Sequence, residues 1–216
     1  MCEATTTNPL LCQFITNSLL TLAQLTTLLP KGSFDAAYEI EATCHSPDKV
    51  QTFSGVAHCL KEGGLFAGYE WCVLPVASGF GGYDKNNSEH VRVKEGIEVG
   101  NGLPTLATPL EVVAALEKAG FKVLEHYDAN ENQNSKFEIP WFHTLEGRYT
   151  MKEFRMTTIG RNLTHVMVNV LEFLRIAPKG SARVSALLNA TALDLVEGGQ
   201  QRLFTPSYYF LAQKVK

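Results

Sequence analysis

Four side chains able to handle charge or protons stand where the chain leaves two expected β-strands. Glu41 and His45 follow the apolar stretch at residues 34–40, and Tyr69 and Glu70 end the next apolar stretch. Carboxylates can stabilise a positive charge, and a histidine or tyrosine can carry a proton. In an open α/β sheet, ligands bind beyond the carboxyl ends of the strands. The four residues are therefore candidate catalytic residues, with an ordinary polar loop after each strand as the alternative.

These two runs and a series of later motifs resemble the sterol 24-C-methyltransferases. That family transfers a methyl group from S-adenosylmethionine (SAM) to the side-chain double bond of a sterol. The similarity extends from about Gly32 to the C-terminus. The motifs occupy residues 40–47, 69–71, 100–104, 139–141, 160–161, 177–181, 195–199 and 204–206. The resemblance implies SAM as methyl donor, a sterol substrate and a place in sterol biosynthesis.

The resemblance also implies roles for the residues at the strand ends. Methylation of the double bond creates a carbocation, which Glu41 and Glu70 would stabilise, and His45 or Tyr69 would lie in the path of the departing proton. A structural histidine is the alternative for His45, and packing is the alternative for Trp71. The remaining expected contacts are with SAM, through Glu41, Ala42 and Thr43, and with the sterol, through Tyr38, Trp71 and Trp141; no metal is expected.

One motif of the family is missing from the sequence. SAM methyltransferases carry a glycine-rich turn after their first strand, where glycines let the backbone approach the cofactor. No G-x-G run occurs before Gly32, and residues 1–31 resemble nothing in the family. We therefore expect impaired activity and weak SAM binding. The alternatives are a non-catalytic sterol-binding or subunit-interaction protein, and another small-molecule methyltransferase of the same fold.

Alternating strand and helix patterns predict an α/β fold with a parallel sheet. The resemblance implies that this is a partial Rossmann-like methyltransferase sheet with a helical cap insertion. Thr108 is the expected cap of one helix, which Gly120 closes. The family resemblance makes the strands the fourth to seventh of the methyltransferase sheet, with the last one antiparallel and the first one at an edge. The expected strands are 34–40, 65–72, 121–127 and 206–215, and the expected helices between them are 47–60 and 109–119.

The expected division of the chain has three parts. Residues 1–31 form an atypical segment, in which the uncharged stretch 10–29 is too rich in polar residues for a membrane span and is compatible with a helix that covers the edge strand. Residues 32–136 form the partial methyltransferase domain. Residues 137–216 form the sterol methyltransferase C-terminal region, with two helices separated at Gly180 before the last strand.

Composition limits the classes of partner. The 216 residues carry a formal net charge of −3, which gives no reason to expect nucleic acid. Five cysteines without C-x-x-C spacing indicate reduced thiols in a cytosolic setting. With the resemblance, the expected location is cytoplasmic or endoplasmic-reticulum-associated. Peripheral membrane association and a homo-oligomer are compatible with the resemblance.

Overall fold

The computed structural model describes most of the chain after its first segment. The expected segment 1–31 therefore lies almost wholly outside the described residues, and so does the stretch that could cover the edge strand. The described residues are 29–76, 81–131, 139–147 and 154–215.

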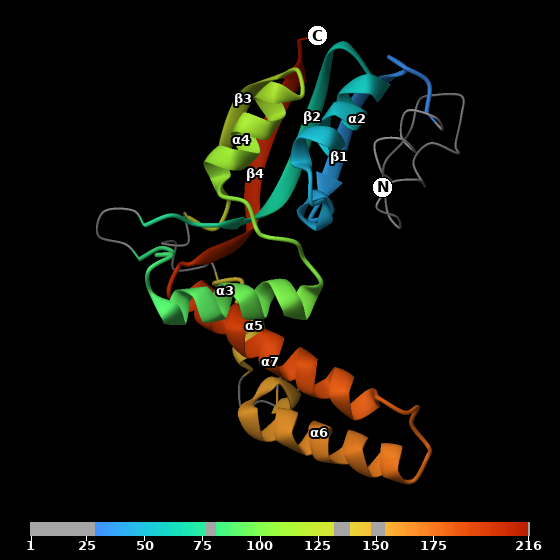
Figure 1. The fold of residues 1–216 in the computed structure, drawn as a ribbon, viewed down its shortest axis with the longest axis vertical. Coiled ribbons are helices and arrows are strands. Elements are labelled where there is room, and N and C mark those ends of the chain that lie inside the picture. Colours follow the sequence, from blue (N-terminus) through green and yellow to red (C-terminus); the bar gives the residue numbers. More distant parts are fainter. Residues whose placement is uncertain (1–28, 77–80, 132–138, 148–153, 216) are drawn as a thin grey trace.

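A four-stranded sheet organises the upper part of the molecule in Figure 1, and its strand order is β1-β2-β4-β3. β1 (Phe34–Ile40) pairs in parallel with β2 (Leu60–Val73), whereas β4 (Phe204–Lys214) runs antiparallel between β2 and β3 (Phe121–Asp128). All four expected strands are present. Within the described residues β1 is an edge strand, which confirms the expected half sheet with an antiparallel last strand.

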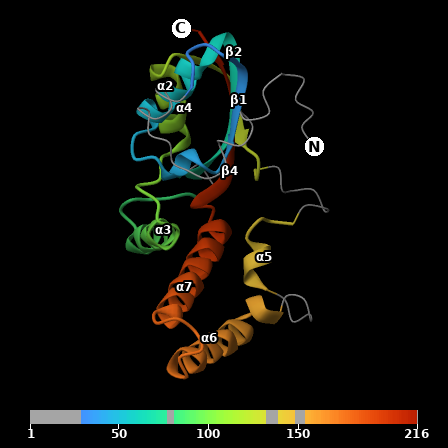
Figure 2. The same ribbon diagram turned by 90° about the vertical axis from the view of Figure 1, so that its right-hand side faces the viewer.

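Two helices cover one face of this sheet, as Figure 2 shows edge-on. They are α2 (Lys49–Cys59) and α4 (Pro109–Lys118). Between them and the sheet, Phe53, Phe66 and Phe210 are fully buried, and the rings of Phe66 and Phe210 meet edge to face at 5.0 Å between centroids. Burial of such aromatic side chains supplies much of the stability of a core.

The opposite face of the sheet carries apolar side chains that remain accessible. Tyr38, Ile40 and Leu65 are 59%, 64% and 39% exposed, and Tyr127 on β3 is 43% exposed. We refer to this side, which lacks α2 and α4, as the open face.

The helical cap extends away from the sheet. α6 (Thr158–Phe173) and α7 (Ser181–Gln200) form a hairpin, and α7 leads back to β4 (Figures 1 and 2). The expected separation at Gly180 is confirmed, because this residue has φ 99° and directly precedes α7. The short elements are η1 (Thr43–His45), α5 (His143–Glu146) and η2 (Phe154–Met156). None of the described helices is long and apolar enough to cross a membrane.

α3 (Ser88–Asn101) is a helix that the apolar spacing does not predict. It packs against α7 through two glycines one turn apart: a Cβ on Gly96 would overlap Asp194, and one on Gly100 would overlap Thr191. Arg92 strengthens the same contact, with Nη1 2.7 Å from the Asp194 carboxylate. Glycines occupy two positions of the packed side, so its apolar pattern is reduced to the buried Val93 and Ile97 and the helix escapes an apolar-pattern search.

The expected start of α2 at residue 47 is wrong. Asp48 is the N-cap, and its side chain accepts a hydrogen bond from the Gln51 amide at 2.9 Å. A carboxylate satisfies an amide at the start of a helix that would otherwise have no partner. Pro47 therefore lies before the cap.

The C-terminal end of α2 is not formed by a glycine. α2 ends at Cys59, and β2 begins at once with Leu60. The carbonyls of His58 and Cys59 accept hydrogen bonds from the amides of Gly32 and Ser33 at 3.0 and 2.9 Å. Because the segment before β1 satisfies these carbonyls, no left-handed glycine is needed.

The α3–α7 contact can be tested with Gly100→Ala. Alanine normally favours a helix over glycine, but here its methyl group would meet the Thr191 side chain, and we expect a loss of about 1–3 kcal/mol in the free energy of unfolding. Urea denaturation measures this change. Val99→Ala, at a neighbouring side chain that is 70% exposed, is the control and should stay within about 0.5 kcal/mol of the wild type. An equally stable Gly100→Ala variant would show that α3 and α7 are not in close contact.

Candidate functional site at the ends of β1 and β2

Glu39 fixes the turn that follows β1. Its side chain is 5% exposed, and its Oε2 atom accepts hydrogen bonds from the amides of Ala42 and Thr43 at 2.9 and 3.3 Å. Its other oxygen, Oε1, is buried without a hydrogen-bond partner. One carboxylate therefore orders the start of η1, and a single oxygen supplies both bonds.

Glu41 occupies a strained backbone position next to this carboxylate. Its φ of 53° lies in the left-handed region, which is costly for a residue with a side chain. Its amide still donates to the Tyr69 carbonyl at 2.9 Å, so the residue remains attached to the end of β2. The Glu41 side chain is exposed.

Glu70 lies at the centre of a buried polar cluster. Its carboxylate is 0% exposed, forms an ion pair with Lys49 Nζ at 2.9 Å and accepts a hydrogen bond from the Thr43 hydroxyl. Lys49 also donates to the Thr43 carbonyl at 3.1 Å. The three residues connect the end of β2, the turn after β1 and the first turn of α2. A buried ion pair is tolerated when further hydrogen bonds satisfy both partners, as they do here.

The buried Glu70 carboxylate affects two acidic groups that are buried beside it. Burial, and then the neighbouring Glu70 carboxylate, raise the pKa of Glu39 from 4.5 to about 8. The same two causes raise the pKa of the buried Cys44 thiol to about 12. Cys44 is therefore a protonated thiol at neutral pH, and its Sγ donates a hydrogen bond to the Glu41 carbonyl at 3.1 Å.

The structure places the expected site residues in three environments. Glu70 and Thr43 belong to the buried cluster on the helix side of the sheet, whereas Glu41 is exposed and Ala42 and His45 are half-buried beside it. Tyr38 lies on the open face. The expected grouping of Glu41, His45 and Glu70 around the same strand ends is therefore present, and their catalytic roles stay predictions.

The open face continues this site as a row of aromatic rings. The Tyr69 ring lies 5.6 Å from that of Tyr209, which lies 5.0 Å from that of Tyr127, measured between centroids. Such rings offer π-faces to an apolar or cationic ligand.

The two expected substrate-binding tryptophans meet in a different cluster. Trp71 and Trp141 contact Phe204 from two sides, with ring centroids 5.1 and 5.6 Å away. The Trp71 Nε1 atom is buried without a hydrogen-bond partner, which is uncommon for an indole. Trp71 thus packs against a hydrophobic cluster, as the alternative to a substrate-binding role expects.

Sequence reasoning missed Glu39 and Lys49. Strand alternation could have found Glu39, because period two places it on the opposite side from the exposed Tyr38 and Ile40. No sequence pattern could have identified the role of Lys49, because this residue of α2 pairs with a carboxylate in β2, Glu70.

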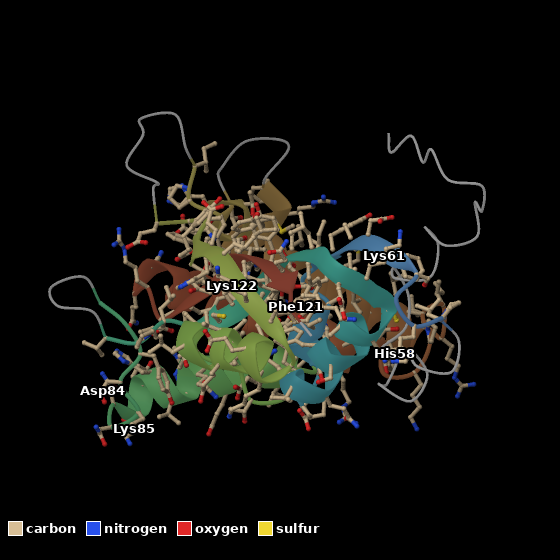
Figure 3. The ribbon with its side chains drawn as sticks, turned by 90° about the horizontal axis from the view of Figure 1, so that it is seen from above. His58, Lys61, Asp84, Lys85, Phe121 and Lys122 are labelled. Carbon is tan, nitrogen blue, oxygen red and sulfur yellow. The ribbon has the colours of Figure 1, made fainter. Side chains whose placement is uncertain are left out.

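The other end of the sheet holds a separate basic hollow. Viewed end-on in Figure 3, His58 and Lys61 lie near the end of α2 and the start of β2, well away from Asp84 and Lys85 near α3. The hollow has a volume of about 500 Å³ and is also lined by Lys214, whose Nζ donates to the Leu60 carbonyl at 2.7 Å. It is distinct from the strand ends that carry the candidate site.

Comparison with known proteins identifies the relatives of this chain. Residues 151–215 match the family model described as "Sterol methyltransferase C-terminal". The cycloartenol-C-24-methyltransferase of Arabidopsis thaliana is 41% identical over 186 residues, which cover 86% of this chain and 52% of that protein. By sequence, the chain is thus homologous to sterol 24-C-methyltransferases over most of its length. The sterol 24-C-methyltransferase of Saccharomyces cerevisiae is 38% identical over 192 residues, with 85% and 48% of the two chains covered.

The match covers only part of these relatives, and a solved structure shares the fold of this chain. The chain spans about half the length of these sterol methyltransferases. Among solved structures, a geranyl diphosphate C-methyltransferase from Streptomyces coelicolor shares the fold, with a TM-score of 0.50 and 15% identity over 88% of this chain and 49% of that one. The expected methyltransferase fold is thereby confirmed.

The buried ion pair yields a double-mutant test. Lys49→Met leaves the Glu70 charge buried and unpaired, and Glu70→Gln does the same to Lys49, whose side chain is 11% exposed. We expect each single variant to lose about 3–5 kcal/mol in the free energy of unfolding, and the double variant to lose clearly less than the sum. Urea denaturation of all four proteins measures this, and additive losses would contradict a direct pairing.

The pKa of Glu39 predicts how stability depends on pH. Because the folded pKa is raised from 4.5 to about 8, the folded protein holds this proton more tightly than the unfolded chain does. The stabilisation is complete below the lower value and is lost as the pH rises towards the upper one. We expect Glu39→Gln, which stays neutral, to flatten the decline in the free energy of unfolding across this window.

Urea denaturation at several pH values measures the effect. Glu41→Gln removes a neighbouring exposed carboxylate and serves as the control, which should keep the wild-type slope. Equal slopes for Glu39→Gln and the wild type would show that Glu39 does not titrate in this window.

Proposed function

We propose that this chain takes part in the transfer of a methyl group from SAM to the side-chain double bond of a sterol. The observation that carries the proposal is the 41% identity to a cycloartenol-C-24-methyltransferase over 86% of the chain. The polar turn beyond β1 and β2 supports it, because ligands of open α/β sheets bind at such strand ends.

In this proposal the exposed Glu41 carboxylate acts on the substrate cation. SAM, when bound, supplies the electrophilic methyl group. The sterol carbon that loses its π-electrons becomes positive only as the new bond forms, so a carboxylate held close to it lowers the barrier more than it tightens substrate binding. The strained backbone at Glu41 fits a functional position. His45, half-buried at the end of η1, is the proposed acceptor of the departing proton.

Glu70 receives a positioning role in the same proposal. Its carboxylate is fully buried and already bound to Lys49 and Thr43, so it holds the turn that presents Glu41. Tyr69 and its ring neighbour Tyr209 lie on the open face and would offer π-faces to the sterol.

The residues expected to hold SAM fit it only in part. The Ala42 and Thr43 amides already donate to Glu39, so they have no hydrogen left for the cofactor. The exposed Glu41 side chain can accept hydrogen bonds from the amino or hydroxyl groups of SAM. We therefore expect the 216-residue chain to hold SAM weakly. The occupied amides also favour the second candidate function, a sterol-binding or subunit-interaction protein without methyl transfer.

The proposal includes the partners of such a reaction. A sterol resides in lipid, so we propose peripheral contact with a membrane on the cytoplasmic or endoplasmic-reticulum side. The exposed apolar residues of the open face also fit a homo-oligomer.

A chimaeric enzyme tests the catalytic proposal. Residues 32–216 would replace the matching half of the Arabidopsis thaliana relative, and methylated cycloartenol would be measured by mass spectrometry. We expect the chimaera to methylate the sterol faster than the 216-residue chain. Glu41→Gln in the chimaera should lower kcat by about a hundredfold and leave KM for the sterol nearly unchanged.

Ser46→Ala, a change in the same loop without loss of charge, is the matched control and should keep the chimaera's kcat. A folded chimaera that binds cycloartenol but does not methylate it would favour the non-catalytic candidate. Equal rates for Glu41→Gln and Ser46→Ala would remove the electrostatic role of Glu41.

A further inference from the structure

The outward side of α6 is apolar. Large side chains recur at intervals of three or four residues, so they lie along one side of the helix. Each of them is at least half exposed, and Phe173 is 86% exposed. These residues, which we call the α6 stripe, are Ile159, Leu163, Val166, Met167, Val170, Phe173 and Leu174. An exposed apolar surface of this extent is typical of an interaction site.

α6 uses its more polar side to contact α7. His165 Nδ1 lies 3.3 Å from the Ser185 hydroxyl, and Thr164 and Val168 border a groove of about 620 Å³ between the two helices. An amphipathic helix in a globular protein normally buries its apolar side instead. The reversed arrangement leaves the α6 stripe available to an apolar environment outside the described residues.

The loop at the far end of the hairpin is ordered and basic. The Glu172 carboxylate accepts hydrogen bonds from the amides of Gly180 and Ala182 at 2.8 and 2.7 Å, which tie the loop to α6. Three exposed cationic side chains follow Glu172 in the sequence: Arg175, Lys179 and Arg183. We call residues 175–183 the hairpin tip. Figures 1 and 2 show that it is remote from the sheet.

Arg175 has a left-handed backbone conformation, which glycine adopts with less strain. Its φ of 58° is left-handed, directly after the end of α6, and glycine is preferred at this position because other side chains are strained there. Gly180 in the same loop shows the usual choice, with φ 99°. A basic side chain at a strained backbone position indicates, independently of the α6 stripe, that its positive charge serves a function.

We propose that the α6 stripe and the hairpin tip lie in the surface of a membrane that contains anionic lipids. The stripe would enter the boundary between headgroups and acyl chains, with Phe173 and Leu174 inserted next to the tip. Arg175, Lys179 and Arg183 would contact lipid phosphates. An apolar helix side that ends in basic residues matches this environment in both hydrophobicity and charge. The inference rests on the membrane contact in the proposed function and supplies the segment and the lipid class.

Sedimentation with lipid vesicles tests the proposal in the absence of SAM and sterol. The 216-residue chain should bind phosphatidylcholine vesicles that contain phosphatidylserine, bind pure phosphatidylcholine more weakly, and lose the difference at high salt. Because no methyl transfer is needed, the result is separate from the catalytic test. Vesicle binding without catalysis supports this inference alone, and catalysis without vesicle binding overturns it alone.

Arg175→Gly separates binding from folding. The variant should melt at a higher temperature, because it relieves the left-handed strain, yet bind the anionic vesicles about fivefold more weakly. Arg202→Gly is the matched control: it also replaces an arginine with positive φ, 55°, but at the sheet end of α7. It should leave vesicle binding unchanged, and an equal loss in both variants would overturn the role of the tip.

Phe173→Ser tests the apolar part. It should weaken vesicle binding about tenfold or more without lowering the melting temperature, since this ring has few contacts in the folded chain. Leu110→Ser, at a side chain that is 72% exposed on α4, is the control and should bind as the wild type does. If Phe173→Ser instead converts a dimer into a monomer, and vesicles are not bound by either, the stripe is an interface between two copies and the membrane proposal is wrong.

Discussion

The burial of the Glu70 carboxylate is the constraint on which the candidate site depends. A charge without access to water must be met by a cation and by hydrogen-bond donors, and Lys49 and Thr43 supply them. Because Lys49 and Thr43 must reach this carboxylate, α2 and the turn after β1 lie against the end of β2. Glu39 completes the turn from the other side, and Glu41 is left strained and exposed at its apex. The shape of the site is thus a consequence of one buried charge.

The same constraint explains why the site combines rigid and accessible parts. The buried cluster lies on the side of the sheet covered by α2 and α4, whereas Tyr69 and Tyr209 face the uncovered side. Glu41 stands between these two regions. A ligand can therefore approach from the aromatic side without disturbing the polar cluster, which preserves the geometry that presents Glu41.

The sequence predicted those elements whose signals are local. The bounds of β1 and the cap of α4 follow from strand patterning and from Thr108, whose side chain accepts from Glu111 in a capping box. α3 escaped prediction because Gly96 and Gly100 leave only a short apolar pattern, Val93 and Ile97, on its packed side. The role of Lys49 and the hydrogen bonds that end α2 escaped because their partners, Glu70 and the segment at Gly32, are distant in sequence. Strand ends could be located from the sequence, but the pairing of charges between them could not.

The position of β4 has a consequence for the synthesis of the chain. This strand follows β1, β2 and β3 in the sequence, yet it lies between β2 and β3 and is the only described strand that pairs with β3. Because β4 is synthesised after the other described strands, β3 and the inner edge of β2 have no partner among these strands until β4 has been made. Unpaired edges attract other chains. The described sheet can form completely only after β4 has been synthesised, and until then the two open edges favour misassembly.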